Sequence, residues 1–219
     1  MDIMQAIQER HAVRDYADKP IEASAKQQLE DKIKELNSES GLHIQLVCDE
    51  PKAFTGFMSR KFSGVKNYIA MIGKKTDDFE EKVGYYGEEL VLLAQQLGLN
   101  TCWVAMSFKN VKSAYQINAG EKLELVISLG YGNTQGVPHK SKNISDVAEA
   151  DGEMPGWFKQ GVQAALLAPT AMNQQKFKFV KKGSTVTAQA GTGFYSKVDL
   201  GIAKLHFELG AGKENFKWA

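Results

Sequence analysis

The sequence contains little cysteine, little arginine and no long apolar run, and each shortage excludes a class of protein. Its 219 residues include two cysteines, Cys48 and Cys102, which lie far apart and outside any Cys-x-x-Cys or His/Cys ligand pattern. Disulfide scaffolds and zinc sites therefore lack support, and a reducing cytoplasm fits this cysteine usage best. Because no stretch approaches about 18 consecutive apolar residues and no basic leader precedes an apolar segment, we expect neither secretion nor a membrane span.

Positive and negative charges are nearly balanced, with 27 lysines and arginines against 26 acidic residues and a formal net charge of +1. This balance argues against a nucleic acid or an anionic membrane as the main partner, so any anion site must be local. The only arginines are Arg10, Arg14 and Arg60, and two of the three lie close together near the N-terminus.

Hydrophobic residues make up 43% of the chain and charged residues 24%, which is typical of a globular protein with one large core. The spacing of apolar residues predicts helices over residues 3–10, 24–37, 84–98, 158–166 and 196–210. Alternating or continuous apolar runs predict strands over residues 43–48, 68–72, 101–105, 123–129, 177–179 and 185–187. We therefore expect an α+β fold, with a mostly antiparallel central sheet flanked by helices and the helix over 84–98 buried at its centre.

Capping residues mark several of these helix ends. Asp2 is the expected N-cap of the first helix, and Gly98 is expected to end the central helix in a left-handed conformation. Ser196 and Gly210 are expected to begin and end the last helix. A polar stretch over residues 133–151 separates this last third, whose order of helices and strands echoes the earlier part without sequence identity.

The glycines of Gly130-Tyr131-Gly132 and Gly136 follow a predicted strand, as the glycines of a dinucleotide-binding turn do. Such a turn must lead into a helix whose N-terminus faces the pyrophosphate. Here an irregular basic segment follows instead, so the spacing does not indicate a dinucleotide-binding fold.

Four cations fall into two pairs, Arg10 with Arg14 and Lys140 with Lys142. On a continuing helix the two arginines would project from one face, where their guanidinium groups could hold a phosphate or a pyrimidine carbonyl. The alternative is a solvated helix face on which the arginines pair with Glu9 or Asp15. The lysine pair follows a strand and could equally belong to an ordinary polar loop.

Residues 168–177, Ala-Pro-Thr-Ala-Met-Asn-Gln-Gln-Lys-Phe, join a predicted helix to a predicted strand. Asn173 and Gln175 could simply satisfy the polar backbone groups of this loop. No serine, cysteine or paired-carboxylate catalytic set is visible, so we name no catalytic residue. The four histidines have no metal-ligand spacing, and we expect no metal.

Four segments together resemble motifs of the FMN-dependent nitroreductase family. Residues 7–16 resemble its R-R-S-x-R-x-F opening, and residues 168–177 resemble its A-P-S-S-x-N-x-Q-P-W loop. Residues 87–104 are similar to its L-A-A-x-x-x-G-L-G-T-x-W segment, and residues 129–142 to its G-Y…K-x-R phosphate clamp. The resemblance implies a nitroreductase-like fold with FMN as cofactor. The implied FMN-binding residues are Arg10, His11, Ala12, Arg14, Val104, Ala105, Met106, Lys140, Lys142, Pro169, Thr170, Ala171 and Asn173.

Three departures separate this chain from the family pattern. Ala12 and Ala171 replace serines, and Lys176-Phe177 replaces Pro-Trp. The Ala-Pro-Thr-Ala-Met-Asn loop also follows the lysine pair, whereas the family places it shortly after the arginine motif. In the ordinary family this loop covers the flavin of the other subunit of a dimer.

The displaced loop suggests that one chain builds its flavin site in cis. Residues 1–150 then form a nitroreductase-like flavin-binding portion, and residues 151–219 resemble half of a second protomer that completes the same site. We expect one compact unit, either a monomer with an internal pseudo-dimer or a homodimer.

The resemblance implies an FMN-dependent oxidoreductase that passes electrons from NAD(P)H to nitroaromatic, quinone or similar small-molecule acceptors. Two alternatives remain: another flavin reaction on the same scaffold, and a flavin-binding or sensing protein without rapid turnover. The replaced serines at Ala12 and Ala171 favour the second alternative.

Overall fold

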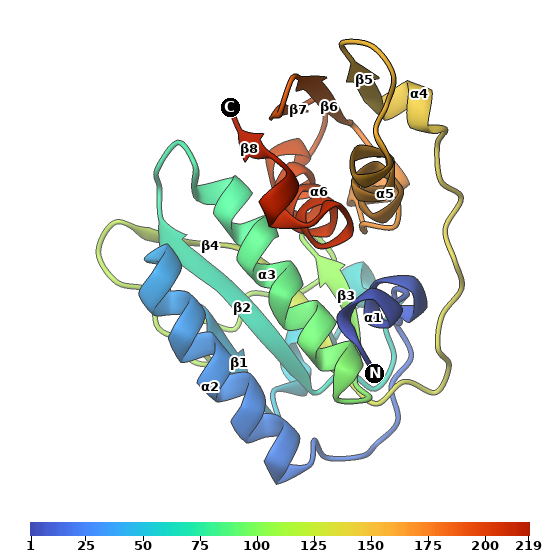
Figure 1. The fold of residues 1–219 in the computed structure, drawn as a ribbon. Coiled ribbons are helices and arrows are strands. Elements are labelled where there is room, and N and C mark those ends of the chain that lie inside the picture. Colours follow the sequence, from blue (N-terminus) through green and yellow to red (C-terminus); the bar gives the residue numbers. More distant parts are fainter. The chain divides into compact units, whose positions relative to one another are not determined.

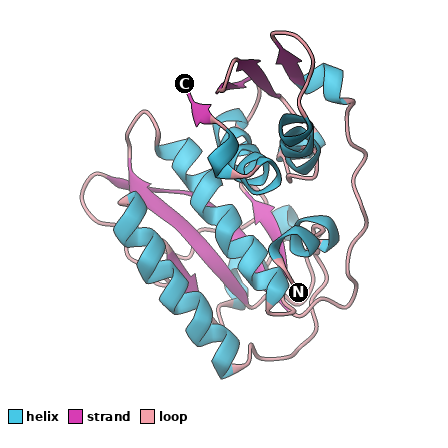
Figure 2. Cartoon of the chain, in the orientation of Figure 1, coloured by secondary structure: helices cyan, strands magenta, loops and turns pink.

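A computed structural model describes residues 1–219, and the chain divides into two compact units. Unit 1 consists of Met1–Gln8, Glu80–Glu88 and Pro138–Ala219, and unit 2 consists of Glu9–Phe79 and Glu89–Val137. The α-helices are α1 (Ile3–Glu9), α2 (Ala23–Ser40), α3 (Phe79–Gln96), α4 (Ile144–Val147), α5 (Gly156–Ala165) and α6 (Ser196–Ala211) (Figure 1). The strands are β1 (Gln45–Val47), β2 (Asn67–Lys74), β3 (Asn100–Val104), β4 (Glu121–Gly130), β5 (Ala148–Ala150), β6 (Phe177–Lys182), β7 (Thr185–Ala190) and β8 (Lys217–Trp218) (Figure 2).

The sheet of unit 2 has the strand order β1-β2-β4-β3, and all its neighbours pair antiparallel. Ser128 on β4 lies opposite Tyr68 on β2 and opposite Cys102 on β3. The predicted buried strand over 68–72 is part of β2, which is buried from Asn67 to Gly73 because it lies inside the sheet. The α+β class and the mostly antiparallel pairing are therefore confirmed.

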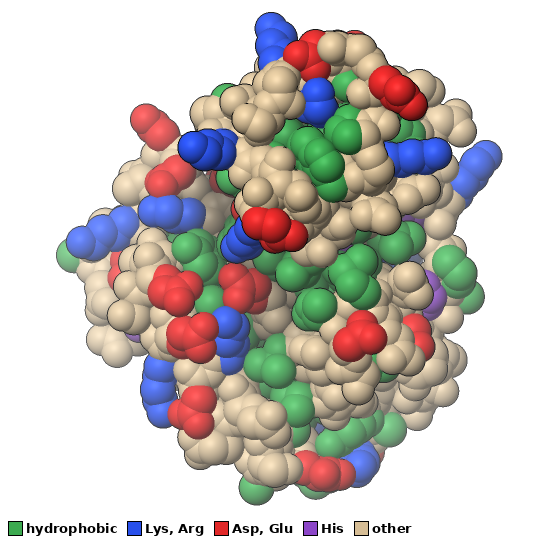
Figure 3. Space-filling view, in the orientation of Figure 1, with side chains coloured by type: hydrophobic (Ala, Val, Ile, Leu, Met, Phe, Trp, Pro, Cys, Tyr) green, Lys and Arg blue, Asp and Glu red, His purple; other side chains and the backbone are tan.

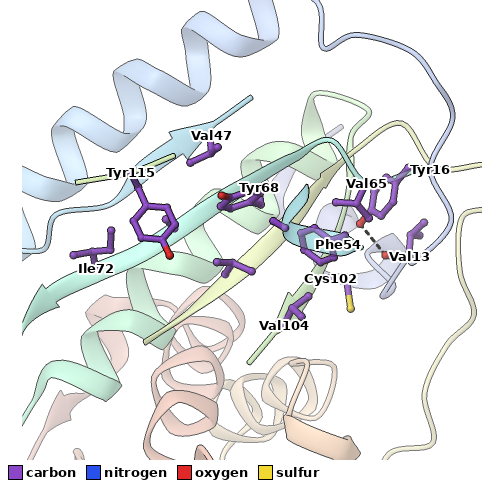
Figure 4. Packing of buried hydrophobic residues seen from close by; sticks show 13 residues of the cluster. Val13, Tyr16, Val47, Phe54, Val65, Tyr68, Ile72, Cys102, Val104 and Tyr115 are labelled. Atoms are coloured by element: carbon purple, nitrogen blue, oxygen red, sulfur yellow. Dashed lines mark hydrogen bonds between the residues drawn. The ribbon is translucent and has the colours of Figure 1, made fainter. Parts of the chain in front are cut away.

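The core of unit 2 packs around the aromatic rings of Phe54, Tyr68 and Tyr16 (Figure 4). The hydroxyl of Tyr16 donates to the backbone oxygen of Val13 at 2.8 Å, and it lies 2.8 Å from the hydroxyl of Ser128 on β4. Burial raises the pKa of Tyr16 far above its usual value, so this hydroxyl stays protonated. The side chain thus fastens the N-terminal segment of unit 2 to the sheet.

Helix α3 ends as its sequence predicts. Gly98 adopts a φ of 75°, and the N–H of Leu99 donates to the oxygen of Ala94 at 2.8 Å, which confirms the expected left-handed cap. The helix begins five residues earlier than predicted, at Phe79, with Glu80 and Glu81 in its first turn, where acidic side chains are favourable.

Unit 1 contains a second sheet, which the sequence did not indicate, with the order β5-β6-β7-β8. Strands β6 and β7, which include the predicted strands over 177–179 and 185–187, pair antiparallel as a hairpin, whereas β5 and β8 add to its two sides in parallel. The rings of Phe179 on β6 and Phe207 on α6 stack with centroids 4.6 Å apart, and Phe158 on α5 meets Phe207 edge-on. This aromatic cluster joins sheet and helices into one core.

Two glycines let α3 and α6 touch through their backbones. A side chain at Gly84 on α3 would collide with the backbone oxygen of Val198, and one at Gly201 on α6 would collide with the backbone oxygen of Glu81. Both positions therefore require glycine because no volume is left for a methyl group.

The predicted caps of α6 are wrong. Tyr195 precedes the helix with a φ of 56° and no side-chain capping bond, so Ser196 is already the first helical residue. The helix ends at Ala211, and Gly212, with a φ of 77°, is its C-terminal cap. Gly210 lies inside the helix, where a Cβ atom would stand 2.6 Å from the Cβ of Ala164, so its small size serves packing against α5.

Basic and acidic side chains both occur across the face drawn in Figure 3, in keeping with the balanced composition. None of the helices is both long and apolar enough to cross a lipid bilayer.

Candidate functional site

The arginine segment of unit 2 is extended rather than helical. Helix α1 ends at Glu9, and Ala12 then forms a parallel bridge with Thr101 at the start of β3. The N–H of Val13 donates to the oxygen of Thr101 at 3.0 Å. The expectation that Arg10 and Arg14 share a helix face is therefore wrong, because the segment takes its hydrogen bonds from β3 instead of continuing the helix.

The same segment is fixed on two further sides. The N–H of Ser63 donates to the oxygen of Arg14 at 2.9 Å, and the N–H of Tyr16 donates back to the oxygen of Ser63 at 3.0 Å. The N–H of Ala17 donates to the oxygen of Tyr131, just beyond β4, at 2.8 Å. The two arginines therefore project from a backbone that is held along its length.

The glycines that mimic a dinucleotide-binding turn make room for this segment. A Cβ at Gly132 would lie 2.8 Å from the Cγ1 of Val13, and a Cβ at Gly136 would lie 2.8 Å from the Cβ of His11. No helix follows them until α4, which confirms that they do not form a dinucleotide-binding turn. Gly136 also has a φ of 72°, a backbone conformation that residues other than glycine rarely adopt.

Arg14 and Arg10 both lie close enough to Cys102 on β3 for their charges to influence its pKa. Burial raises the pKa of the Cys102 thiol, and the two guanidinium groups oppose that shift without overcoming it. Arg10 is almost fully buried, whereas Arg14 is exposed and makes no ion pair. The carboxylate of Asp15 accepts from the Nδ2 of Asn133 at 3.1 Å, so the alternative in which Arg14 pairs with Asp15 is not realised.

The remaining predicted residues of unit 2 lie at the other end of β3. Val104 is the last strand residue and is buried, Ala105 is half-buried, and the side chain of Met106 is 71% exposed. Val104 lies three residue steps beyond Thr101 along the extended strand, a span of roughly 10 Å. Unit 2 therefore places the segment that holds Arg10 and Arg14 beside the start of β3 and the exposed Met106 just beyond its other end.

In unit 1 the lysine segment and the loop over 168–177 come together, although about 30 residues separate them. The Nδ2 of Asn173 donates to the oxygen of Lys140 at 2.9 Å, and the Nζ of Lys142 donates to the oxygen of Gln175 at 3.0 Å. The side chain of Lys140 is exposed and makes no ion pair. Two of the predicted motifs thus form one continuous structure.

The loop itself has an unusual backbone. Met172, Asn173 and Gln175 have φ values of 53°, 53° and 45°, in the left-handed region that residues other than glycine seldom adopt. Pro169 and Thr170 are half-buried. The Nε2 of Gln175 donates to the Oδ1 of Asn173 at 2.8 Å, but the backbone groups that these two amides contact belong to Lys140 and Lys142 rather than to the loop itself. Strain of this kind persists only where surrounding contacts impose it.

Asp199 is a site residue that the sequence did not indicate. Its carboxylate, 3% exposed on the first turn of α6, accepts from the N–H of Ala171 at 2.9 Å and from the Nε2 of Gln174 at 2.6 Å. Burial raises the pKa of Asp199 to about 6, although these hydrogen bonds oppose the shift. Its only sequence signal was an acidic residue in the first turn of a helix, which is too common to single it out.

Each of the two clusters, Arg10 with Arg14 in unit 2 and Lys140 with Lys142 in unit 1, carries groups that can bind an anion. Every predicted side chain that carries charge is a cation, and the remaining contacts come from amide and backbone groups, which can bind phosphate and carbonyl oxygens. No three His, Cys, Asp or Glu side chains gather in a metal-binding arrangement. Cationic, amide and backbone groups of this kind can bind and orient a ligand by hydrogen bonds.

The sequence model of the family described as "Putative TM nitroreductase" matches residues 2–211. No curated protein matches the chain significantly. Among solved structures, a nitroreductase from Thermotoga maritima is 24% identical over 98% of this chain and 85% of its own, with a TM-score of 0.68. A protein from Parabacteroides distasonis named as an NADH dehydrogenase/NAD(P)H nitroreductase is 18% identical over 69% of this chain and 98% of its own, with a TM-score of 0.54. A nitroreductase from Desulfovibrio desulfuricans in complex with FMN is 18% identical over 71% of this chain and 99% of its own, with a TM-score of 0.53.

Proposed function

Because this chain belongs to the nitroreductase family, we propose that it binds FMN and passes electrons from NAD(P)H to nitroaromatic, quinone or similar acceptors. Two structural relatives support the cofactor and the electron donor: one holds FMN, and another is named for NADH and NAD(P)H. The observation that carries the proposal is the extended segment that holds Arg10 and Arg14 against the start of β3.

The residues present fit FMN by their chemistry. Arg10, Lys140 and Lys142 supply charge-assisted donors for the phosphate, and Arg14 supplies a planar donor for the ring edge. When bound, FMN supplies the electron-transfer chemistry, and nearby donors and positive charge favour its reduced, more negative form. The backbone at 104–106 and the loop at 169–173 orient the ring. Ala12 and Ala171 lack the hydroxyl groups of the family's serines, so they contact the flavin through their backbone groups alone.

The visible absorption spectrum of the purified protein tests this proposal. We expect flavin bands that bleach within seconds of adding NADH or NADPH without oxygen and return when a quinone or nitroaromatic is added. Flavin bands that do not bleach would favour the alternative of a flavin-binding protein without turnover. Absence of flavin, together with no binding of added FMN, would refute the proposal.

We further propose that residues 1–150 and 151–219 complete one flavin site within a single chain. The Parabacteroides and Desulfovibrio proteins match this chain over nearly their whole length, yet they account for only 69% and 71% of it. The Thermotoga protein accounts for 98%. The part of this chain that the Parabacteroides and Desulfovibrio proteins do not match has about the size expected of half a second protomer.

Mixing two inactive variants distinguishes a site built in cis from one shared between chains. Co-expressed Arg10→Ala and Asn173→Ala chains restore intact sites only if different chains contribute the two residues. In a cis arrangement every site carries one lesion, so FMN affinity stays low after mixing. Recovered affinity would show that the site is shared and would overturn the pseudo-dimer.

A further inference from the structure

Gln175 joins the lysine segment to the loop of unit 1 through its side-chain amide. The Nε2 donates to the oxygen of Lys140 at 2.9 Å and to the Oδ1 of Asn173 at 2.8 Å. The Oε1 accepts from the N–H of Lys142 at 2.8 Å. The side chain is nearly inaccessible, because only 2% of the residue is exposed.

The backbone of Gln175 makes two further hydrogen bonds to the same surroundings. Its oxygen accepts from the Nζ of Lys142 at 3.0 Å, and its N–H donates to the Oγ1 of Thr170 at 3.0 Å. Its φ of 45° is unusual for any residue with a side chain. Together these five hydrogen bonds stabilise the unusual backbone conformation of this buried glutamine.

We propose that Gln175 is a positioning residue for the flavin phosphate, through Lys142 and Asn173. This inference rests on the proposed function, since it assigns a role in FMN binding. An ammonium group has three N–H donors, and the bond to Gln175 uses one, so two remain for phosphate oxygens. Gln175 thereby fixes the place of the Lys142 charge, while its Nε2 fixes the orientation of the Asn173 amide.

The contacts of the neighbouring Gln174 provide a matched comparison. Gln174 lies in the same loop, but its Nε2 donates to the carboxylate of Asp199 and to the oxygen of Phe194, and not to the lysine segment. Loss of Gln174 therefore loosens the loop from α6, whereas loss of Gln175 separates the loop from the two lysines.

Binding titrations with FMN and riboflavin test the positioning role. Gln175→Gly removes the amide and leaves a residue that adopts the left-handed backbone without strain. We expect its Kd for FMN to rise roughly tenfold or more, as for loss of hydrogen bonds to a charged group, and its Kd for riboflavin to rise much less. In Gln174→Ala the ratio of the two Kd values should stay as in the wild type.

A double-mutant cycle with Lys142→Ala separates positioning from general support of the fold. If Gln175 acts through Lys142 and Asn173, Gln175→Gly weakens FMN binding by a smaller factor in the Lys142→Ala background than in the wild type, because only its effect through Asn173 remains. Losses that multiply, or equal losses for FMN and riboflavin, would overturn the positioning role. Should Gln175→Gly fail to fold, Gln175→Asn serves the same cycle, because asparagine tolerates this backbone but its amide is one methylene too short.

The wild-type titration keeps the two proposals apart. If the wild type binds FMN and Gln175→Gly binds it equally well, only the positioning role is overturned. If the wild type does not bind FMN, the proposed function fails, and the positioning role fails with it.

Discussion

The charge on Asp199 should make the folded protein less stable as the pH rises. Burial raises the pKa of this carboxyl from 3.8 to about 6, so the folded state binds the proton more tightly than the unfolded state does. The stabilisation from protonation is therefore complete below about pH 3.8 and is lost as the pH rises through about 6.

The size of this effect follows from the shift in pKa. A shift of about two pKa units corresponds to roughly 3 kcal/mol once the group is fully ionised in both states. Part of that loss has already occurred at pH 5, where most unfolded chains are ionised at this position. Between pH 5 and pH 8 the contribution of Asp199 to the free energy of unfolding should therefore fall by roughly 1 to 2 kcal/mol.

Urea unfolding at several pH values measures this contribution in wild type and Asp199→Asn. The asparagine keeps an acceptor for the N–H of Ala171 but cannot ionise, so the stability of the variant relative to wild type should increase by roughly 1 to 2 kcal/mol from pH 5 to pH 8. Asp31→Asn is the control, because Asp31 is exposed and hydrogen bonds lower its pKa, which places its titration below this range. A difference for Asp199→Asn that stays constant with pH would refute the reasoning.

Three further predictions concern unit 2. Arg14→Ala should weaken FMN binding by roughly 1.5 to 3 kcal/mol, the range for charge-assisted hydrogen bonds, and an unchanged affinity in titrations would exclude contact with the flavin. Gly136→Ala should lower the free energy of unfolding by at least about 1 kcal/mol more than Gly120→Ala, because both have a positive φ but only Gly136 lacks space for a Cβ. Equal losses in urea would contradict this. Tyr16→Phe should lower the free energy of unfolding by about 1 to 2 kcal/mol, since it removes two buried hydrogen bonds. An unchanged free energy in thermal and urea unfolding would contradict this.

Periodicity predicted the elements whose own residues determine their structure. The apolar stripe of α3 and the apolar run of β2 are strong because burial selects such residues at every contacting position. Strands β5 and β8 were missed because they are short and pair in parallel with distant partners. Pairing of this kind leaves little pattern in the strand itself.

The candidate site was predicted in its parts but not in its connections. The resemblance identified Lys142 and Asn173, yet it assigned no role to Gln175, whose bonds reach 33 to 35 residues back along the chain. Helical spacing suggested a shared face for Arg10 and Arg14, but a bridge to Thr101 ends that helix first. Such tertiary contacts override local preference, and a single sequence does not display them.

The way the chain is divided has a consequence for folding during synthesis. Unit 2 is complete once Val137 has left the ribosome, whereas unit 1 takes its last strand, β8, from the final residues of the chain. Helix α1 and the first half of α3 are therefore translated early. Their packing stays incomplete until α6 has been synthesised, because α6 packs against the backbone of α3 at Gly84. Since domains fold as units while the chain emerges, the growing chain carries one finished unit and two unpacked segments until α6 and β8 have been synthesised.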